Sequence, residues 1–154
     1  MAGTTHPQFW GEFEHNLDDR GRIVFPQEFR TALGDEFVIS RGPDGALLIF
    51  PTNVWLEIEQ KLQDAILQRE TGFLQRMFGG RTFVRLDPQG RLVLPKHLRE
   101  WAGFDDNNVS ILVGQGPKIE VWSKTRWRSY HANFTYDRMY DAAERVGLAQ
   151  TVDR

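Results

Sequence analysis

The sequence predicts an α+β, β-rich domain with pseudo-twofold symmetry, in which two copies of one unit share a barrel or sandwich core. An internal repeat is the first observation: residues 17–34 recur as residues 86–103, with eight of 18 positions identical. Length is the second, because 154 residues match one ordinary domain. A unit of about 40 residues buries too little surface to be stable alone. The two copies are therefore expected to pack together.

Each copy is expected to fold as strand, turn, strand, helix, strand, turn and strand. Proline stops the second strand and opens the short helix, and the glycine after that helix favours a left-handed backbone. Pro43-Asp44-Gly45 is a strong turn signal between the last two strands of the first copy. The expected strands are 13–17, 22–25, 37–40 and 46–50, then 82–86, 91–94, 109–113 and 118–122, and the expected helices are 27–33 and 96–102.

Helical periodicity predicts three further helices outside the repeat. Residues 53–69 place apolar side chains at helical spacing, and residues 73–78 form a short helix that two glycines end. Ser123 is a good N-cap for a C-terminal helix bearing Trp127, Tyr130 and Phe134. The aromatic side chains of these helices indicate core packing or, where they exceed what a small barrel covers, a subunit interface.

These elements divide the chain into five expected parts. They are a flexible segment 1–11, a first unit 12–54, a helical linker 55–80, a second unit 81–124, and a C-terminal helix and tail 125–154.

Composition excludes several classes of protein. The longest apolar run, 46–50, is far shorter than the roughly 20 residues of a membrane span, so no membrane partner is expected. Residues 1–8 lack the basic start and apolar stretch of a secretory signal. The absence of cysteine removes disulfides, thiolate metal sites and cysteine nucleophiles. These features fit a cytoplasmic protein.

Charge is unevenly distributed along the chain. The formal net charge of −2 alone argues against nucleic acid as a partner. Residues 1–80, however, carry seven basic and twelve acidic groups, whereas residues 81–154 carry twelve basic and nine acidic groups. The window 81–100 holds five basic and two acidic residues, which indicates a local basic face.

The repeated Asp-x-x-Gly-Arg turn is the candidate functional motif. The aspartate accepts hydrogen bonds from backbone N–H groups of its turn, and the glycine supplies a positive φ. The aspartate is also expected to pair with the arginine and hold its guanidinium forward, although exposed ion pairs stabilise by only about 0–1 kcal/mol. The expected turn-organising residues are Asp18, Gly21, Asp87 and Gly90.

Cations gather around both turns. Arginine suits bidentate contact with phosphate or guanine edges. If the turn occurred once, the simplest interpretation would be a plain β-turn with a solvated arginine. Its occurrence at two equivalent places favours a binding surface. The candidate cations are Arg20, Arg22, Arg85, Arg91 and Lys96.

The sequence offers no catalytic constellation, so no enzyme, metal, cofactor or small-molecule substrate is expected. Glu12 and Glu14 face one side of a strand, but no partner acid or nucleophile is identifiable. No glycine-rich phosphate loop opens a helix. The four histidines form no close pair and lack metal-ligand spacing; they are His6, His15, His97 and His131.

Motifs along most of the chain, from about residue 9 to about residue 148, resemble the MraZ family of transcriptional regulators, which are built from two SpoVT/AbrB-type units. The motifs that carry this resemblance are Phe9-Trp10-Gly11-Glu12, residues 17–22 with Pro26, residues 41–45, Pro51 with Trp55, Leu86-Asp87 with Gly90-Arg91, Leu98-Arg99, Ala102-Gly103, and Glu120-Val121-Trp122. Residues 1–8 extend beyond the usual start of the family.

The resemblance implies both a fold and a function. The implied fold is an AbrB-like swapped-hairpin barrel that assembles into a ring homo-oligomer. The implied function is to bind short repeats in double-stranded DNA upstream of the division and cell-wall gene cluster, to repress that operon, and to reside on the nucleoid. The family's DNA-contacting motif falls on Asp18…Arg22 and Asp87…Arg91.

The second turn departs from the first, with Pro88-Gln89 in place of Asp19-Arg20, so Gln89 is expected to hydrogen-bond a base or phosphate instead. The alternative function is a non-enzymatic assembly or adaptor protein whose arginine turns bind acidic protein surfaces.

Overall fold

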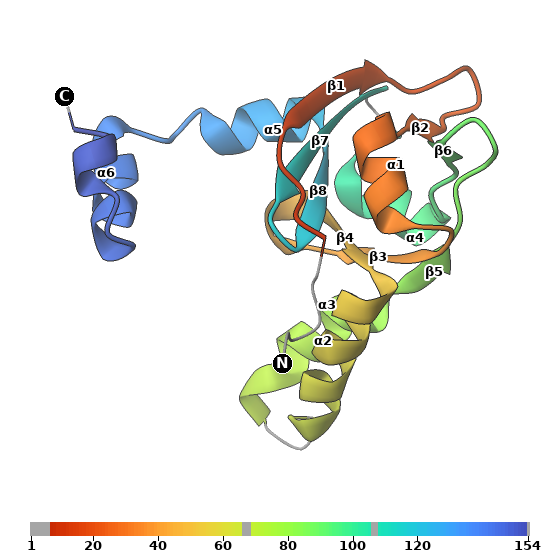
Figure 1. Ribbon diagram of the computed structural model, residues 1–154, viewed down its shortest axis with the longest axis horizontal. Coiled ribbons are helices and arrows are strands. Elements are labelled where there is room, and N and C mark those ends of the chain that lie inside the picture. The colour runs from red at the N-terminus through yellow and green to blue at the C-terminus, as the bar shows by residue number, and fades with distance from the viewer. Residues whose placement is uncertain (1–6, 66–68, 106–107, 154) are drawn as a thin grey trace.

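The computed structural model describes residues 7–65, 69–105 and 108–153, and its strands form a six-stranded antiparallel sheet and a separate two-stranded ribbon (Figure 1). The large sheet has the strand order β1-β7-β8-β4-β3-β5, and the ribbon pairs β2 with β6. The strands are β1 (Glu12–Asn16), β2 (Ile23–Val24), β3 (Phe37–Arg41), β4 (Leu47–Pro51), β5 (Thr82–Val84), β6 (Arg91–Leu92), β7 (Val109–Gln115) and β8 (Lys118–Ser123). The expected α+β, β-rich architecture is confirmed.

Helices connect and cover these strands. The α-helices are α1 (Gln27–Leu33), α2 (Thr52–Asp64), α3 (Gly72–Gly79), α4 (Lys96–Ala102), α5 (Lys124–His131) and α6 (Tyr136–Arg145), and the short 3₁₀ helices are η1 (Pro43–Gly45), η2 (Arg69–Thr71) and η3 (Ala149–Thr151).

The two units exchange their first strands. Strand β1 of the first unit pairs with β7 of the second, with Phe13 opposite Leu112. Strand β5 of the second unit pairs with β3 of the first, with Val84 opposite Phe37. Strands β4 and β8 pair at the centre of the sheet, where the two units meet. Each unit therefore completes the sheet of the other, so the two repeats form one folded body.

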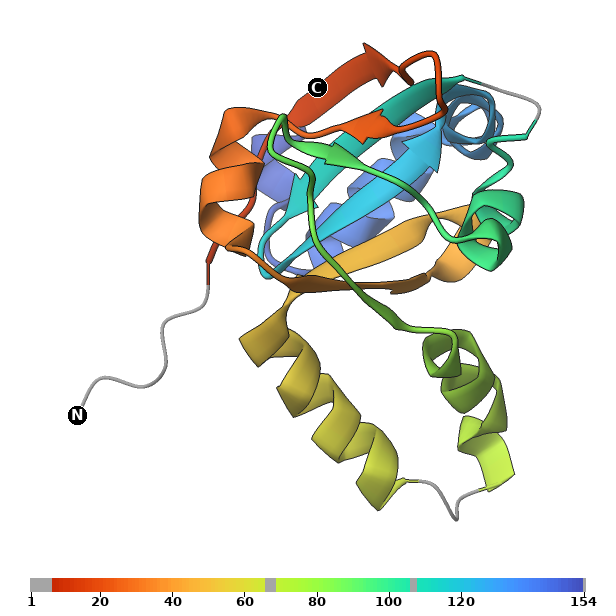
Figure 2. The same ribbon diagram turned by 90° about the vertical axis from the view of Figure 1, so that its right-hand side faces the viewer.

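The main core lies between the sheet, the ribbon and helices α1 and α4. Alternation along β3 turns Phe37 and Ile39 into this core and Val38 to the opposite face. Phe29 of α1 and Leu98 of α4 fill the core from the two helices, which lie on either side of the ribbon in Figure 2. Both helices begin after a proline and end at a glycine with positive φ, as expected from the repeat.

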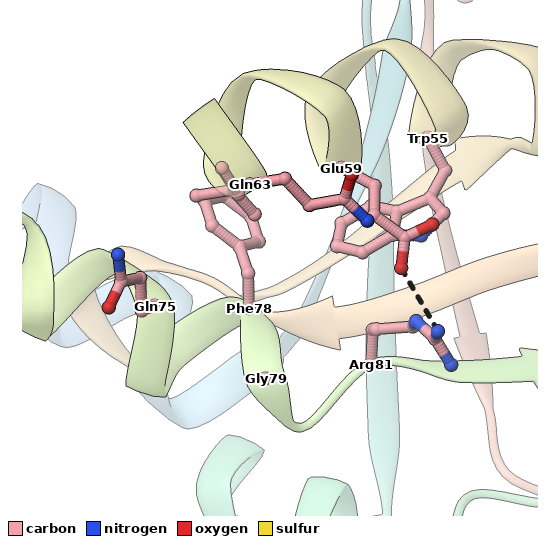
Figure 3. A pocket seen from close by; sticks show the side chains of 8 residues that line it. Trp55, Glu59, Gln63, Gln75, Phe78, Gly79 and Arg81 are labelled. Atoms are coloured by element: carbon pink, nitrogen blue, oxygen red, sulfur yellow. Dashed lines mark hydrogen bonds and ion pairs between the residues drawn. The ribbon is translucent and has the colours of Figure 1, made fainter. Parts of the chain in front are cut away.

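Helices α2 and α3 form a hairpin that projects from the sheet (Figure 2). Trp55 of α2 is buried together with Val38 and Phe50. Phe78 of α3 returns onto Trp55, with the ring centroids 5.8 Å apart (Figure 3). Helix α2 ends at Asp64, earlier than expected, and residues 66–68 of the expected helix lie outside the described residues.

The C-terminal region differs from the expected single helix. Helix α5 ends at His131, and Phe134 lies between α5 and a separate helix α6, which the apolar periodicity does not predict. Thr135 caps α6 by accepting a hydrogen bond from the Arg138 backbone N–H at 3.2 Å. This cap starts a new helix, and α6 lies apart from the barrel in Figure 1.

The beginning of the described chain packs against the second unit. Phe9 is buried, and its backbone exchanges hydrogen bonds of 2.7 and 2.9 Å with Gly116. Part of the segment expected to be flexible is thus fixed to the sheet, whereas residues 1–6 lie outside the described residues. Within the described ranges, every helix is too short or too polar to cross a membrane.

Candidate nucleic-acid interface

The first repeated turn is organised by one carboxylate. Oδ1 of Asp18 accepts hydrogen bonds from the backbone N–H groups of Arg20 at 3.0 Å and Arg22 at 2.9 Å. Oδ2 of Asp18 accepts a third hydrogen bond from Nε of Arg22 at 2.6 Å. Gly21 adopts a φ of 73°, which is the left-handed region that favours glycine. The turn is therefore fixed in the way that its sequence predicts.

The second turn repeats this geometry. Oδ1 of Asp87 accepts from the backbone N–H groups of Gln89 and Arg91, each at 2.9 Å, and Oδ2 accepts from Nε of Arg91 at 2.8 Å. Gly90 has a φ of 77°. The side chains differ at the tip, because Oε1 of Gln89 accepts a hydrogen bond from Nη2 of Arg91. The expected ion pair within each turn is confirmed.

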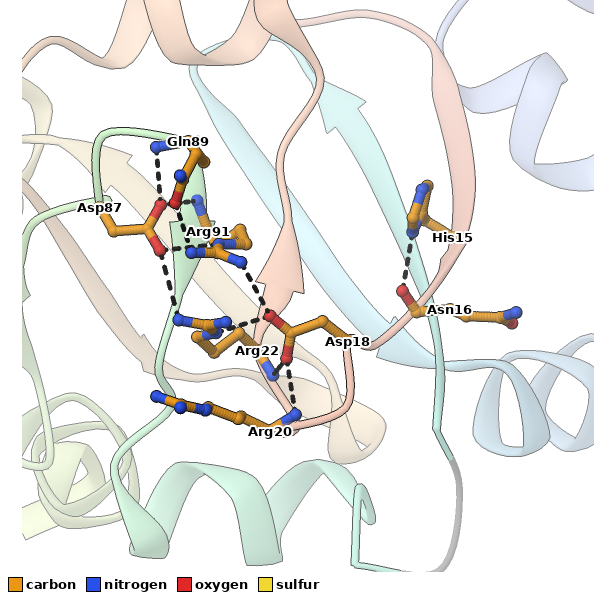
Figure 4. Close-up of polar contacts among 8 residues, drawn as sticks. All are labelled: His15, Asn16, Asp18, Arg20, Arg22, Asp87, Gln89 and Arg91. Carbon is orange, nitrogen blue, oxygen red and sulfur yellow. Dashed lines mark hydrogen bonds and ion pairs between the residues drawn. The ribbon is translucent and has the colours of Figure 1, made fainter.

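The two turns lie side by side because β2 and β6 pair antiparallel, with Val24 opposite Arg91. Each arginine consequently approaches the other turn's carboxylate (Figure 4). Nη1 of Arg22 lies 3.7 Å from Oδ2 of Asp87, and Nη1 of Arg91 lies 3.6 Å from Oδ2 of Asp18. We call these four side chains the Asp–Arg cluster. It joins the two repeats into one surface.

The cluster is partly covered and internally neutralised. Its side chains are 17 to 26% exposed, and two carboxylates face two guanidinium groups. Desolvation by burial raises the pKa of Asp18, but hydrogen bonds from the backbone and guanidinium of Arg22 outweigh that effect and lower the pKa below its ordinary value. The pKa of Asp87 is lowered in the same way by Arg91. Both carboxylates therefore remain ionised near neutral pH and hold the arginines in place.

The other candidate residues differ in how exposed they are and in which side chains they contact. Arg20 and Gln89 are exposed at the tips of the two turns and lie beside the cluster (Figure 4). Arg85 is exposed and pairs with Glu36 at 3.5 Å. Lys96 opens α4, where it is 78% exposed and lies 3.8 Å from Glu100. Arg20 and Gln89 are thus the candidates that the turns themselves present to a partner.

Arg30 of α1 is a neighbouring cation that is not among the residues predicted from the sequence. A Cβ placed on Gly90 would lie 2.5 Å from Cδ and Nη1 of Arg30, so this side chain covers the second turn. Nη2 of Arg30 donates to Oε1 of Gln27 at 2.7 Å, which holds it there. The repeat could have indicated this residue, because Arg30 and Arg99 occupy equivalent positions in the two copies and are both arginine.

Chemically, the interface supplies fixed cations and hydrogen-bond donors on a rigid ribbon. Among the residues that the structure describes, no group of three or more histidine, aspartate or glutamate side chains is placed to hold a metal ion. The two units with exchanged first strands match the expected AbrB-like class of folds.

Comparison with known proteins identifies the family within that class. The family model described as "MraZ protein, putative antitoxin-like" matches residues 8–75 and again residues 77–149. A protein of Desulforamulus reducens named transcriptional regulator MraZ is 41% identical over 126 residues, which are 80% of this chain and 87% of that protein. Proteins of the same name from Moorella thermoacetica and Halothermothrix orenii are 40% and 37% identical, over 90% and 91% of this chain and 96% and 99% of their own lengths. The chain belongs to the MraZ family.

Proposed function

We propose that the chain is a sequence-specific DNA-binding transcriptional regulator that acts in the cytoplasm on the nucleoid. It binds short repeats upstream of the division and cell-wall gene cluster, represses that operon, which includes its own gene, and binds as a ring of several copies. The names of its relatives support a regulator of transcription. The repeats, the repression and the ring are what the family resemblance implies.

The observation that carries this proposal is the Asp–Arg cluster. It holds two arginine turns side by side on one ribbon. The distance between the turns is fixed by contacts between them, from each arginine to the aspartate of the other turn. Such pre-organisation lowers the entropy that an interface loses on binding. Arg20 and Gln89 then extend from the fixed turns toward phosphate or base edges, where arginine makes bidentate contacts.

Assembly compensates for the small number of cations on each subunit. A net charge of −2 and two short turns imply weak binding by one copy. A ring that presents the same turns several times meets several DNA repeats at once, which raises avidity by about 10²–10⁴ without new contacts.

Fluorescence anisotropy with DNA from upstream of the chain's own gene, measured over a salt series, tests the proposal. Arg20→Ala removes an exposed cation outside the Asp–Arg cluster and should flatten the slope of log K against log salt by about 0.9 for each subunit whose phosphate contact is lost. Arg22→Ala with Arg91→Ala should weaken binding further, because it removes two cations and loosens both turns. Lys61→Ala, an exposed cation on α2, is the matched control and should leave affinity and slope unchanged.

Unchanged affinity and slope in the Arg22→Ala, Arg91→Ala protein would rule out the turns as the DNA-binding site. An assembled wild-type protein with no affinity for this DNA would favour the adaptor function instead.

A further inference from the structure

A small hollow lies where the α2–α3 hairpin meets the rest of the fold, and we call it the α3–α4 hollow. It has a volume of about 260 Å³, and two arginines, two aromatic residues and one methionine line it: Arg41, Phe73, Arg76, Met77 and Trp101. Arg41 ends β3, Trp101 belongs to α4, and the other three residues come from α3. Figure 2 shows α3 below α4 at this junction. The hollow shares no residue with the Asp–Arg cluster.

The indole ring of Trp101 is held in place by hydrogen bonds. Nε1 of Trp101 donates to the backbone carbonyl oxygens of Gly42 at 3.1 Å and Ala46 at 3.0 Å. The Arg41 guanidinium lies over the indole, with Cζ 5.7 Å from the ring centroid. The ring and the cation are therefore oriented before a ligand binds, which lowers the entropy lost on binding.

The positive charge of the hollow is not balanced by the protein. Among the residues that the structure describes, neither Arg41 nor Arg76 has a carboxylate oxygen within 4.0 Å of its guanidinium. Arg99 shows the contrast, since its Nε donates to Oδ1 of Asp105 at 2.9 Å. Arg41 is half-buried, so its charge is partly removed from water, which is unfavourable unless an anion compensates it. The hollow is thus suited to an anion.

The repeat shows that the fold does not require these side chains. Trp101 of α4 corresponds to Ala32 of α1 in the alignment of the two units. Arg41 of β3 likewise corresponds to Val113 of β7. The equivalent helix and strand therefore form with smaller apolar residues at these positions. A tryptophan and an arginine at this place favour a role in binding.

We infer that the α3–α4 hollow binds a small phosphate monoester that carries a planar ring, of the class of a nucleoside monophosphate. A phosphate monoester has a charge of about −1.5 to −2 near neutral pH, which balances two guanidinium groups, whereas a carboxylate balances only one. The planar fork of arginine donates bidentate hydrogen bonds to phosphate oxygens. This site goes beyond the proposed DNA-binding function and does not depend on it.

The aromatic and apolar part of the lining accounts for the ring of the ligand. Phe73 is 64% exposed and Trp101 is half-buried, so both offer ring surface, and aromatic side chains stack on bases. The volume lies just below the roughly 300–1,000 Å³ of pockets for drug-sized ligands, which limits the occupant to a small molecule. Because the lining combines α3 with β3 and α4, a bound ligand also links the hairpin to the sheet.

Isothermal titration calorimetry of the full chain tests the inference, with adenosine monophosphate as the probe. Adenosine supplies the ring without the charge, and inorganic phosphate supplies the charge without the ring. Adenosine monophosphate should bind saturably and at least about tenfold more tightly than either fragment, because each fragment lacks an interaction of that scale. An affinity no higher than that of inorganic phosphate would mean an unselective group of cations and would overturn the inference.

Single variants locate the binding. Arg41→Gln and Arg76→Gln should each weaken adenosine monophosphate roughly 10- to 100-fold and remove its advantage over adenosine. Phe73→Ala should weaken it roughly fivefold or more and leave inorganic phosphate unchanged. Arg128→Gln, which removes an exposed arginine from α5, is the matched control and should bind as the wild type does. Binding that survives in all three test variants would place the ligand elsewhere and overturn the assignment.

Folding does not limit this test. Arg76 and Phe73 are exposed, so their variants should keep the fold even if Arg41→Gln does not, which circular dichroism checks. A bound ligand should also slow amide hydrogen exchange in α3, since it links the hairpin to the sheet. Exchange in α3 that adenosine monophosphate leaves unchanged at saturation would contradict the proposed position of the ligand.

DNA is the other phosphate-bearing ligand that the assays must separate. Each phosphate of DNA carries one negative charge, so it matches two guanidinium groups less well than a monoester does. Arg76→Gln should keep the wild-type affinity for DNA in anisotropy, because the Asp–Arg cluster is untouched. Lost DNA affinity in this variant, with no saturable binding of adenosine monophosphate to the wild type, would assign the hollow to DNA and overturn the inference. Failure of the nucleotide alone leaves the proposed DNA-binding function standing.

Discussion

Replacing Gly90 by alanine should destabilise the protein more than the same replacement at Gly21. Both glycines occupy the same position of the repeated turn and have nearly equal φ angles of 77° and 73°. An alanine in the left-handed region costs about 1–2 kcal/mol at either position. The two sites differ in their surroundings, since a Cβ on Gly21 meets nothing within 4 Å, whereas a Cβ on Gly90 lies 2.5 Å from the Arg30 side chain.

The additional cost at Gly90 comes from moving Arg30. We expect the movement of Arg30 that makes room to break its hydrogen bond to Gln27, which contributes about 0.5–1.5 kcal/mol. The expected totals are about 1–2 kcal/mol for Gly21→Ala and about 1.5–3.5 kcal/mol for Gly90→Ala. In a domain of this size, each kcal/mol lowers Tm by about 2–4 °C.

Thermal unfolding of the two variants measures this difference, and a double-mutant cycle isolates its cause. In an Arg30→Ala background, Gly90→Ala should cost no more than Gly21→Ala does in the wild type, because the obstructing side chain is absent. Equal destabilisation by the two alanines in the wild-type background, or a cost at Gly90 that survives removal of Arg30, would refute the reasoning.

Three other predictions follow from the contacts described above. The lowered pKa values of Asp18 and Asp87 contribute stability that is present above the ordinary value of 3.8 and is lost as pH falls through the lower pKa of the folded state. An Asp18→Asn, Asp87→Asn protein should therefore lose less stability than the wild type between about pH 5 and pH 2 in chemical denaturation. Trp101→Phe removes an indole donor to two backbone carbonyls at 3.0 and 3.1 Å and should cost about 1–3 kcal/mol in the same assay, a smaller loss indicating that water replaces the indole. Ser123→Ala removes the N-cap of α5 and should cost about 1 kcal/mol, with faster amide hydrogen exchange confined to α5.

Local signals in the sequence were sufficient to predict the bounds of the short helix that follows each turn. Helices α1 and α4 span 27–33 and 96–102, as expected, because proline and glycine mark their ends by backbone geometry alone. The C-terminal helix was extended wrongly, since Phe134 continues the helical spacing of Trp127 and Tyr130. The Thr135 cap ends that continuity, and a single capping residue is a weaker signal than apolar periodicity.

The candidate site was only partly predictable for a similar reason. Hydrogen bonds within each turn join residues two to four positions apart, so the repeat predicted them. The contacts between Arg22 and Asp87, and between Arg91 and Asp18, join residues 65 and 73 positions apart. They exist because β2 and β6 pair in an antiparallel register, which tertiary packing sets. The position of Arg30 over the second turn depends on the same packing.

The exchange of first strands has a consequence for how the two repeated turns can diverge. Each unit needs the other to complete its sheet, so a chain with a single unit would have to pair with an identical copy and would present two identical turns. Joining the units in one polypeptide removes that constraint. The first turn carries Asp19-Arg20 and the second carries Pro88-Gln89 on the same ribbon. Covalent fusion thus lets one barrel present two different tips, which can change independently while the shared scaffold stays intact.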